Sequence, residues 1–508
     1  MTIQVGSTLT TDDVVAAAGG AHVSLAPGLA EQMEPARRLI EEVVASERTV
    51  YGVTTGFGYL ANVRISAPET RALQRDIVLS HATAVGEELP EEVVRAMLLL
   101  KARTFGFGIS GVRFELVERL VDMLRHGMHP VVPSQGSLGA SGDLAPLAHL
   151  ALPLIGRGEV RLRGERLPTE DALRRLGWAP LELTYKEGLS LVNGTEGMLA
   201  LGILTLHRVE RLARAADITG AMTVEACLGT DQAFAEALVG LRKHAGPLVT
   251  AANLRKLLAG SEIVQSHRES EHLVQDAYSL RCIPQVHGAY RDALAYVRTT
   301  LEAELASAID NPSVLADEGV VGSAGNFHGE ALALALDHLG LLTAGFATIS
   351  ERRVARLVDP ELNNGLPAFL TKDPGRRSGF MLVQYTAAAL VSENRSLCFS
   401  ASSDSIPTSA GQEDHVSMGM TSARKSVQIA TNTERALAVE ALAAAQGIGL
   451  RHPLKAAPGT GAGFETVRAL SPELEEDRPL SGDIEAMAQM IAGRVFEGAV
   501  EAAVGPLA

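Results

Sequence analysis

Long segments with apolar residues at every third or fourth position dominate the second half of this chain of 508 residues. Such spacing places the apolar side chains along one face of a helix. The clearest examples are residues 198–216, 294–309, 330–357, 381–400 and 422–446. Several of these segments exceed an ordinary globular helix in length, so they predict a bundle of long helices and a mainly α fold.

The first 200 residues are predicted to form a separate, mostly helical domain. Helices are expected after a capping pattern at Thr10 and at three further places, residues 27–46, 72–80 and 91–105. The only persuasive strand signal is the polar and apolar alternation over residues 159–167, which predicts a small hairpin. The predicted domains are therefore residues 1–200 and residues 201–508.

The composition limits the partners and the compartment of the protein. A formal net charge of −15 argues against nucleic acid or an anionic membrane as a partner, because either requires a basic face. The three cysteines form neither a CxxC pair nor a disulfide framework, and residues 1–4 begin no signal peptide, so a cytoplasmic location is expected. The apolar stretch 331–349 is interrupted by Asp337 and His338, so it is expected to be a buried helix rather than a membrane span.

A glycine-rich loop is expected to lead directly into a helix within residues 134–149. Its three glycines allow the backbone to fold back at positive φ with little steric cost. Asp143 is expected to cap the helix, because Pro146 suits a first helical turn and an apolar run follows. Backbone N–H groups and the positive end of a helix dipole are then expected to converge on residues 140–142.

Three other motif matches favour structural explanations. Residues 106–111 match G-x-G-x-x-G, but a helix rather than a strand is predicted before them, so this motif and residues 459–463 are expected to be turns between helices. The surroundings of Ser141 do not fit the G-x-S-x-G elbow of a serine hydrolase. The His and Glu residues within 267–272 lack metal-ligand spacing and are expected to lie on a charged, solvated helix, so no metal site is predicted.

The tripeptide Ala140-Ser141-Gly142, followed by Asp-Leu-Ala-Pro-Leu-Ala-His, resembles the signature of the aromatic amino acid ammonia-lyases. In that family the glycine amide nitrogen attacks the alanine carbonyl, and loss of water, including the serine hydroxyl, leaves a methylidene-imidazolone. The residue types suit this chemistry, because glycine lets its amide nitrogen approach closely and serine carries a β-hydroxyl that can leave. The resemblance implies an electrophile made from the chain itself, with no exogenous cofactor.

Matching segments far apart in the chain extend the resemblance from Tyr51 to about Arg424. They are residues 51–58, 79–82, 187–195, 275–282, 325–330 and 412–418. The Ser-His pair within 79–82 and the last segment are similar to the histidine-specific branch of the family, as is the segment 275–282. Two positions depart from the family pattern, since Thr54 stands where many members of that branch have Asn and Glu196 replaces the usual Gln.

The resemblance implies catalytic roles for four side chains. Tyr51 would be the base that removes the β-proton, with Tyr278 assisting. A tyrosine acts as a base near neutral pH only if its pKa falls from about 10, and a helix N-terminus with nearby cations would provide that bias. His81 and Glu413 would engage the imidazole of the substrate.

Four further side chains are implied to bind the substrate. Arg281 and Asn193 would hold its α-carboxylate, and a planar guanidinium suits bidentate capture of such a group. Arg281 lies three residues after Tyr278, so the two share a face if the segment is helical. Gln275 and Phe327 would complete the site, with Phe327 beside the electrophile.

For the whole chain, the resemblance implies elimination of ammonia from L-histidine to give trans-urocanate, in a homotetramer whose sites are shared between subunits. Whether the electrophile attaches to the amine or to the imidazole ring stays open. The alternatives are a tyrosine or phenylalanine ammonia-lyase or an aminomutase of the same family, against which Ser80, His81 and Glu413 argue. A catalytically silent structural homologue is a further alternative, against which the intact tripeptide argues.

Overall fold

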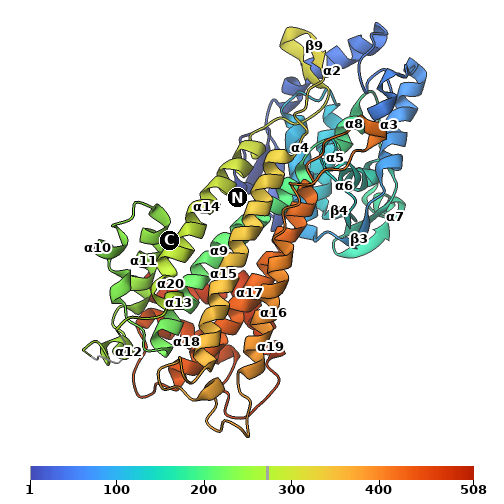
Figure 1. The fold of residues 1–508 in the computed structure, drawn as a ribbon. Coiled ribbons are helices and arrows are strands. Elements are labelled where there is room, and N and C mark those ends of the chain that lie inside the picture. Colours follow the sequence, from blue (N-terminus) through green and yellow to red (C-terminus); the bar gives the residue numbers. More distant parts are fainter. Residues whose placement is uncertain (1, 270–273) are drawn as a thin grey trace. The chain divides into compact units, whose positions relative to one another are not determined.

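The computed structural model describes residues 2–269 and 274–508, and it confirms the predicted mainly α fold (Figure 1). By its contacts the chain divides into two compact units. Unit 1 comprises Met1–Leu204, Thr299–Asp337 and Ser400–Arg424, and unit 2 comprises Thr205–Arg298, His338–Phe399 and Lys425–Ala508. The prediction of two separate domains, residues 1–200 and 201–508, stays a prediction.

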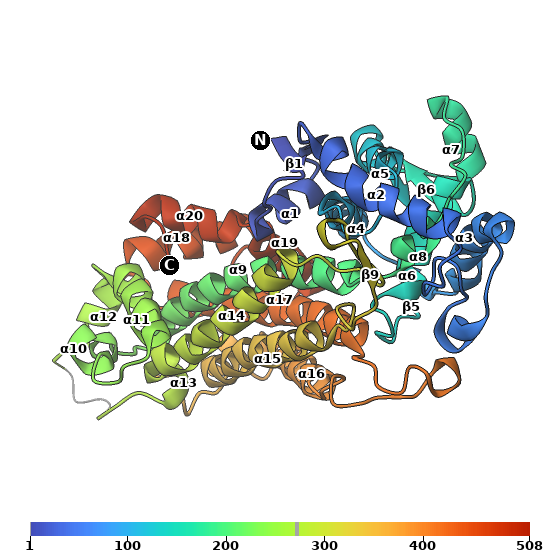
Figure 2. The same ribbon diagram turned by 90° about the horizontal axis from the view of Figure 1, so that it is seen from above.

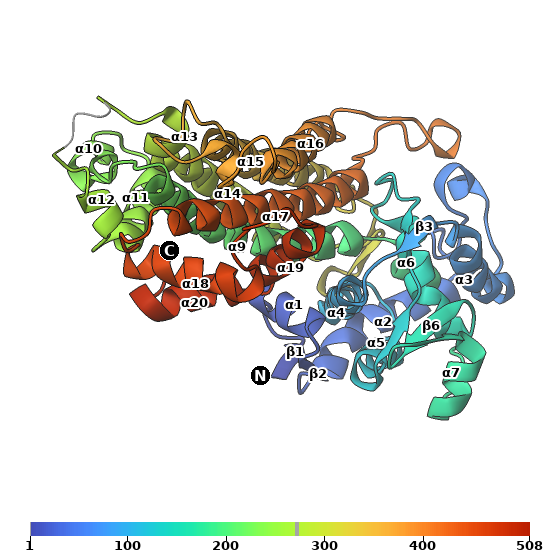
Figure 3. The ribbon, with the colours of Figure 1, turned by 90° about the horizontal axis from the view of Figure 1, so that it is seen from below.

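The core of unit 1 is built around helix α4 (Glu91–Gly106), which is buried along almost its whole length. It packs against α1 (Thr11–Ala18), α2 (Leu29–Ala45) and α5 (Phe114–His126), as Figure 3 shows. Helix α1 begins with the predicted capping box, because the Thr10 hydroxyl accepts from the Asp13 N–H and the Asp13 carboxylate accepts from the Thr10 N–H. The N-terminal helices expected from the sequence are therefore confirmed.

Short strands accompany these helices in unit 1. β1 (Thr2–Val5) pairs in parallel with β2 (His22–Leu25), and antiparallel pairs are formed by β3 (Val85–Glu88) with β5 (Pro133–Gln135) and by β8 (Ser313–Leu315) with β9 (Val320–Gly322). β6 (Glu159–Leu162) and β7 (Glu165–Pro168) form the predicted hairpin, which β4 (Met128–Pro130) extends. β6 and β7 are equally short, but they follow one another around Gly164, so their alternation continues over residues 159–167. Each of the other strands has three or four residues, too few on their own to show a period of two, and they were not predicted.

A second group of helices in unit 1 carries the candidate site. Helices α3 (Ala67–His81), α6 (Leu144–Ala151) and α8 (Glu187–Val192) pack against one another, and α3 confirms the helix expected over residues 72–80. The unit is completed by α7 (Thr169–Leu176) and by the 3-10 turns η1 (Gly58–Asn62), η2 (Leu152–Ile155), η4 (Ala316–Glu318) and η6 (Ser409–Gly411).

Long helices, most of whose residues belong to unit 2, form its core as predicted, and Figure 2 shows them running alongside one another. They are α9 (Glu196–Ala226), α14 (Ile283–Leu305), α15 (Glu330–Val358), α16 (Met381–Leu397) and α17 (Gly419–Gly449). Within the unit, Glu440 on α17 accepts hydrogen bonds from Thr219 on α9 and from Arg353 on α15. Buried polar contacts therefore join the helices across an otherwise apolar core.

Shorter elements complete unit 2. They are α10 (Glu236–Val239), α11 (Ala245–Leu258), α12 (Glu262–Gln265), α13 (Tyr278–Arg281), α18 (Pro458–Leu470), α19 (Ser481–Ala492), α20 (Val495–Val504), η3 (Gln232–Phe234) and η5 (Ala368–Leu370). Figure 3 shows α18 and α20 packed side by side.

The two glycine motifs have different structures. Residues 106–111 connect α4 to α5 as predicted, with Gly108 at φ +74° and Gly111 at φ +66°. The turn predicted at residues 459–463 is wrong, because these residues lie inside α18. Glycine serves close packing there, since a Cβ at Gly463 would lie 3.0 Å from the sulfur of Met222.

Among the described residues, one helix, α15, is long and apolar enough to cross a membrane. Of its most apolar stretch, 67% is buried within the protein. This burial is typical of a core helix and agrees with the buried helix expected over residues 331–349.

Candidate active site

The loop before α6 folds into a tight turn at the predicted tripeptide. Gly139 and Gly142 pair across the turn, which leaves Ala140 and Ser141 at its tip. Gly139, Ser141 and Gly142 all have positive φ, at +86°, +52° and +82°. Serine rarely adopts this conformation, so the surrounding structure holds Ser141 in a strained backbone geometry.

Residues at the end of α8 hold this turn in place. The N–H of Gly194 donates to the carbonyl of Ser141 at 3.1 Å, and the N–H of Asp143 donates to the carbonyl of Gly194 at 2.7 Å. A Cβ at position 142 would lie 1.9 Å from the Gly194 carbonyl oxygen, which is far inside a van der Waals contact. Position 142 therefore accepts glycine alone, as the predicted cyclisation requires.

Asp143 does not cap α6, although it occupies the N-cap position. Its Oδ2 accepts from the N–H of Met198 at 2.8 Å, and its Oδ1 accepts from the Ser137 hydroxyl at 2.9 Å. Burial raises the pKa of Asp143 to about 6, and the nearby charge of Glu196 contributes to the rise. The prediction of a capping role is therefore wrong, because the fully buried carboxyl group binds the start of α9 instead.

A cavity of about 560 Å³ in unit 1 brings five of the predicted site residues together. They are Tyr51, His81, Ser141, Asn193 and Glu413. The rest of the wall is mainly apolar and is contributed by the segment 56–65, by α3 and by the neighbouring residues Leu144 and Leu189. A mostly apolar cavity with a few converging polar groups is typical of a site for a small molecule.

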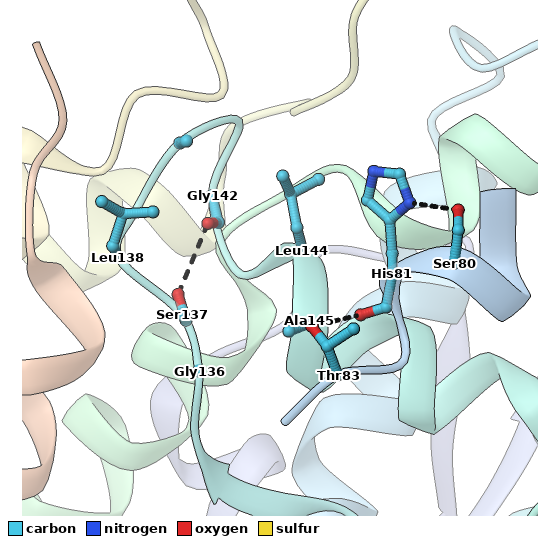
Figure 4. A pocket seen from close by; sticks show the side chains of 10 residues that line it. Ser80, His81, Thr83, Gly136, Ser137, Leu138, Gly142, Leu144 and Ala145 are labelled. Carbon is cyan, nitrogen blue, oxygen red and sulfur yellow. Dashed lines mark hydrogen bonds between the residues drawn. The ribbon is translucent and has the colours of Figure 1, made fainter. Parts of the chain in front are cut away.

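A smaller cavity of about 200 Å³ shares Ser80, His81 and Leu144 with the larger one (Figure 4). Ala140 and Gly142 line it together with Ser80, Thr83 and Ser137. The Ser80 hydroxyl lies 3.1 Å from Nδ1 of His81 and so helps to orient the imidazole ring, which lines both cavities. The tripeptide is thus accessible from two sides within unit 1.

Tyr51 lies in the wall of the larger cavity, and its phenol oxygen accepts a hydrogen bond from the N–H of Gly58 at 3.3 Å. Burial raises the pKa of Tyr51, and the negative charge of Glu413 contributes to the rise. This direction is the opposite of the lowering expected from the sequence. Within unit 1, an acid rather than a cation is the charged group that acts on Tyr51.

His81 and Glu413 face the same cavity from different segments. His81 ends α3, while Glu413 follows η6 and accepts from the Thr408 hydroxyl at 3.0 Å. Burial lowers the pKa of His81, although the charge of Glu413 opposes the change. At neutral pH the imidazole of His81 is therefore uncharged and can either donate or accept one hydrogen bond at each nitrogen.

The two departures from the family pattern differ in how well their side chains are satisfied. The Thr54 hydroxyl donates to the carbonyl of Arg48 at 2.6 Å and accepts from the N–H of Val50 at 2.9 Å. Glu196 is buried with its Oε1 3.0 Å from Nζ of Lys101, so the added negative charge has a cation beside it. The other carboxylate oxygen of Glu196, Oε2, is buried without a hydrogen-bond partner among the described residues.

Buried charged groups behind the cavity were not predicted from the sequence. Lys101, in the middle of α4, donates to the carbonyls of Ser190 and Asn193, and Lys186 lies 2.6 Å from Oδ2 of Asp310. The available signal was a lysine within the apolar run of a helix, since a buried charge needs a partner. The identity of that partner depends on contacts distant in sequence, which no local pattern shows.

The remaining predicted residues lie elsewhere. Gln275, Tyr278 and Arg281 belong to unit 2, where α13 places the Arg281 guanidinium 4.7 Å from the centre of the Tyr278 ring. This confirms that Tyr278 and Arg281 share a face of one helical turn. Phe327 is half-buried in the segment before α15 and is not part of the cavity wall in unit 1.

One group of described residues, His328, Glu330 and His415, has donor atoms within 4.8 Å of one another. The two imidazole rings are stacked, with 8° between their planes and 5.8 Å between their centres. Nε2 of His328 lies 3.2 Å from the backbone carbonyl oxygen of His415, so this ring nitrogen has a hydrogen-bond partner within the protein.

The charged segment after α12 is not the solvated helix that was expected. His267 lies in a turn, where its Nε2 is 3.1 Å from the carbonyl oxygen of Gly229, and Glu269 follows in the same turn. Glu271 and His272 lie outside the described residues.

Comparisons with known proteins agree with this geometry. The aromatic amino acid lyase family matches residues 9–469. Histidine ammonia-lyases of Symbiobacterium thermophilum and Gloeobacter violaceus are each 50% identical to this chain. Each match covers 99% of this chain, together with 99% of the Symbiobacterium protein and 98% of the Gloeobacter protein. Among solved structures, histidine ammonia-lyase of Trypanosoma cruzi matches with a TM-score of 0.91 and 39% identity, over 99% of this chain and 96% of that one. Tyrosine aminomutase of Streptomyces globisporus matches with a TM-score of 0.94 and 36% identity, over the full length of both chains.

Proposed function

The chain belongs to the aromatic amino acid lyase family, and we propose that it eliminates ammonia from L-histidine to give trans-urocanate. The observation that carries the proposal is one cavity that contains His81 and Glu413 together with Ser141. An imidazole and a carboxylate complement the two nitrogens of a histidine side chain, which an apolar wall would not. The curated relatives at about half identity are histidine ammonia-lyases over nearly their full lengths.

The residues of the turn fit the proposed methylidene-imidazolone. Ala140 and Gly142 are held close by the tight turn, and position 142 accepts only glycine. The group would be formed from Ala140, Ser141 and Gly142 and would supply an electrophilic carbon at the floor of the cavity. Gly194 and Asp143 hold the turn that contains it through backbone hydrogen bonds.

The substrate imidazole would lie between His81 and Glu413. Neutral His81 can donate to one ring nitrogen, and the Glu413 carboxylate can accept from the other. Such a pair would hold the ring in one orientation. Specificity for histidine over phenylalanine would follow, because a phenyl ring leaves both polar groups without a partner in a largely apolar cavity.

Tyr51 is the proposed base for the β-proton. Burial and Glu413 raise its pKa within unit 1, so the required bias would come from the assembled site. Tyr278 and Arg281 would assist there, with the Arg281 guanidinium holding the α-carboxylate, and Gln275 and Phe327 would complete the pocket.

We propose that the assembly is a homotetramer in the cytoplasm, with residues from several subunits in each site. Large apolar side chains on α15 and α16 support an assembly, since they are about half exposed in the single chain. They are Leu334, Leu341, Leu382 and Tyr385. Apolar side chains exposed at this density are typical of surfaces that another subunit covers.

The test is turnover of L-histidine, L-tyrosine and L-phenylalanine by the purified chain without any added cofactor. We expect trans-urocanate from L-histidine, followed by its ultraviolet absorbance, and turnover of the other two amino acids at least about 100-fold slower. Preferential conversion of L-tyrosine, or formation of a β-amino acid, would assign the chain to the tyrosine ammonia-lyase or aminomutase branch instead. Intact-mass measurement showing no dehydration at the tripeptide would favour a silent homologue.

A further inference from the structure

Arg103 is a buried cation in the last turn of α4, and only 5% of its surface is exposed. Its Nη2 donates to the backbone carbonyls of Glu304 and Ser307, at the end of α14. Among the residues that the structure describes, no carboxylate forms an ion pair with Arg103, and no group accepts a hydrogen bond from its Nε or Nη1. A buried charge is costly unless it is paired, so this guanidinium lacks a counter-charge.

The two acids whose charges act on Arg103 have other partners. Glu196 lies 3.0 Å from Nζ of Lys101, and Glu304 accepts from the Thr195 hydroxyl at 2.6 Å. Burial raises the pKa of Glu304, which favours its neutral form. Burial lowers the pKa of Arg103 to about 10, so the guanidinium still carries its charge at neutral pH. That charge is therefore only partly compensated within the protein.

Arg103 lines a cavity of about 210 Å³ in unit 1, which shares no lining residue with the two cavities of the candidate site. The wall is formed by the segment before α1, the end of α4 and the end of α14. Ser7 and Thr8 add two hydroxyl groups to it. The large apolar side chains of the wall are Leu9, Phe107 and Leu305.

The contact of Arg103 with Phe107 leaves the edges of the guanidinium free. Its central carbon lies 4.8 Å from the centre of the Phe107 ring, so the aromatic side chain covers the cation without using an N–H group. The unpaired Nε and Nη1 groups are then available as donors to an anion in the cavity.

The wall suits a ligand with one negative charge and a small apolar body. A carboxylate accepts charge-assisted hydrogen bonds from a guanidinium and further bonds from hydroxyl groups. A phosphate would bring nearly two charges to a single cation that already has two acids nearby. A cavity of about 150 Å³ holds a benzene molecule, so this one has room for a ring that bears a carboxylate. We infer that this cavity binds a small organic carboxylate on Arg103.

The experiment measures binding of benzoate to the full-length protein by saturation-transfer NMR. We expect a dissociation constant of about 1 mM or tighter. Benzamide has the same ring without the charge and should bind at least about tenfold more weakly. Inorganic phosphate at the concentration of benzoate should not displace it.

Three variants locate the binding. Arg103→Met removes the cation, keeps an unbranched side chain and should weaken benzoate at least about tenfold. Ala306→Trp places a large ring in the same cavity from an exposed position, so it should abolish binding, and it also serves if Arg103→Met does not fold. Arg281→Met is the matched control for the proposed active site and should leave benzoate binding unchanged.

Weaker binding in Arg281→Met with none lost in Arg103→Met would place benzoate at the proposed active site and overturn the inference. Failure of the unaltered protein to bind benzoate, or equal binding of benzamide, would overturn it as well. Displacement by phosphate would overturn the assignment to a carboxylate. The inference does not depend on the proposed function, which is tested separately by formation of urocanate from L-histidine.

Discussion

Two completely buried aspartates, one in each unit, are held by opposite means. In unit 2, Asp217 on α9 contacts Nδ1 of His287 at 2.7 Å and the Arg291 guanidinium at 2.6 Å, both on α14. In unit 1, Asp143 accepts hydrogen bonds from a backbone N–H and from the Ser137 hydroxyl, and the nearby charge that acts on it is an acid. Burial opposes ionisation of both, yet the pKa of Asp217 is lowered while that of Asp143 rises to about 6.

This difference in partners indicates that buried charges stabilise packing in unit 2 and serve function in unit 1. In unit 2, Asp217 on α9 and Glu440 on α17 each lie beside a cation on a neighbouring helix, which fixes how these helices align but leaves nothing for a ligand. At the candidate site, neutral donors hold Asp143, and Ser141 has strained backbone. His81 and Glu413 face a cavity, and the charged pairs of Lys101 and Lys186 lie behind it. Such a region is expected to carry the chemistry, and the bundle to carry the stability.

The variant Ser141→Ala should show the largest effect and should affect activity alone. It deletes the hydroxyl that has to leave when the electrophile forms, so turnover of L-histidine is expected to fall about 1,000-fold or more. The melting temperature should be unchanged within about 2 °C, because Ser141 is half-buried at the tip of its turn and lines the cavity. Ser403→Ala, at an exposed serine of the same unit, is the control for an inert hydroxyl.

Wild-type turnover in Ser141→Ala would show that activity does not require a methylidene-imidazolone formed from this tripeptide. A large loss of stability would show that the turn stabilises unit 1 as well as serving catalysis. The proposed division between a catalytic region and a stabilising bundle would then be wrong.

The variant Glu413→Gln should lower kcat/KM for L-histidine about 100-fold, near the upper end of what a hydrogen bond to a charged group contributes. The amide presents a neutral oxygen where the imidazole needs a charged acceptor. Asp414→Asn is the matched control, since this neighbouring acid is exposed and outside the cavity wall. An unchanged rate in Glu413→Gln would mean that the carboxylate does not engage the ring.

The sequence was sufficient for the parts of the structure that local pattern determines. Long periodic segments predicted the bundle, and the residue types at 140–142 predicted a turn that only glycine can complete at its last position. The partners of the buried charged groups behind the cavity could not be predicted from local sequence patterns. Lys101 meets Glu196, and Lys186 meets Asp310, across 95 or more positions of the chain. Whether a buried acid lies beside a cation determines whether its pKa is raised or lowered. That contact forms only when folding brings distant segments together, so no local pattern predicts it.

The variant Asp217→Asn should destabilise the protein by about 3–5 kcal/mol at pH 7, because it leaves Arg291 buried beside a neutral partner. The pKa of Asp217 is lowered in the folded state, so its contribution is present above pH 4 and is lost as the pH falls. The difference from wild type, measured by urea unfolding, should shrink in acid. Asp231→Asn, which breaks a partly exposed pair with Arg268, should change stability by less than about 1 kcal/mol.

The variant Asp143→Asn sharpens the comparison, because its pH dependence should have the opposite sign. The folded-state pKa of Asp143 is raised from 3.8 to about 6, so protonated Asp143 favours the folded state below pH 4, and this advantage is lost as the pH rises through 6. Relative to Asp143→Asn, the wild type should lose up to about 3 kcal/mol of unfolding free energy between pH 4 and pH 7. Asparagine has no such titration and can keep both hydrogen bonds, with its carbonyl accepting from Met198 and its amide donating to Ser137. If the two proteins instead follow the same curve from pH 4 to pH 7, Asp143 is ionised throughout, and the contrast with Asp217 reduces to a difference of partners without a difference of charge.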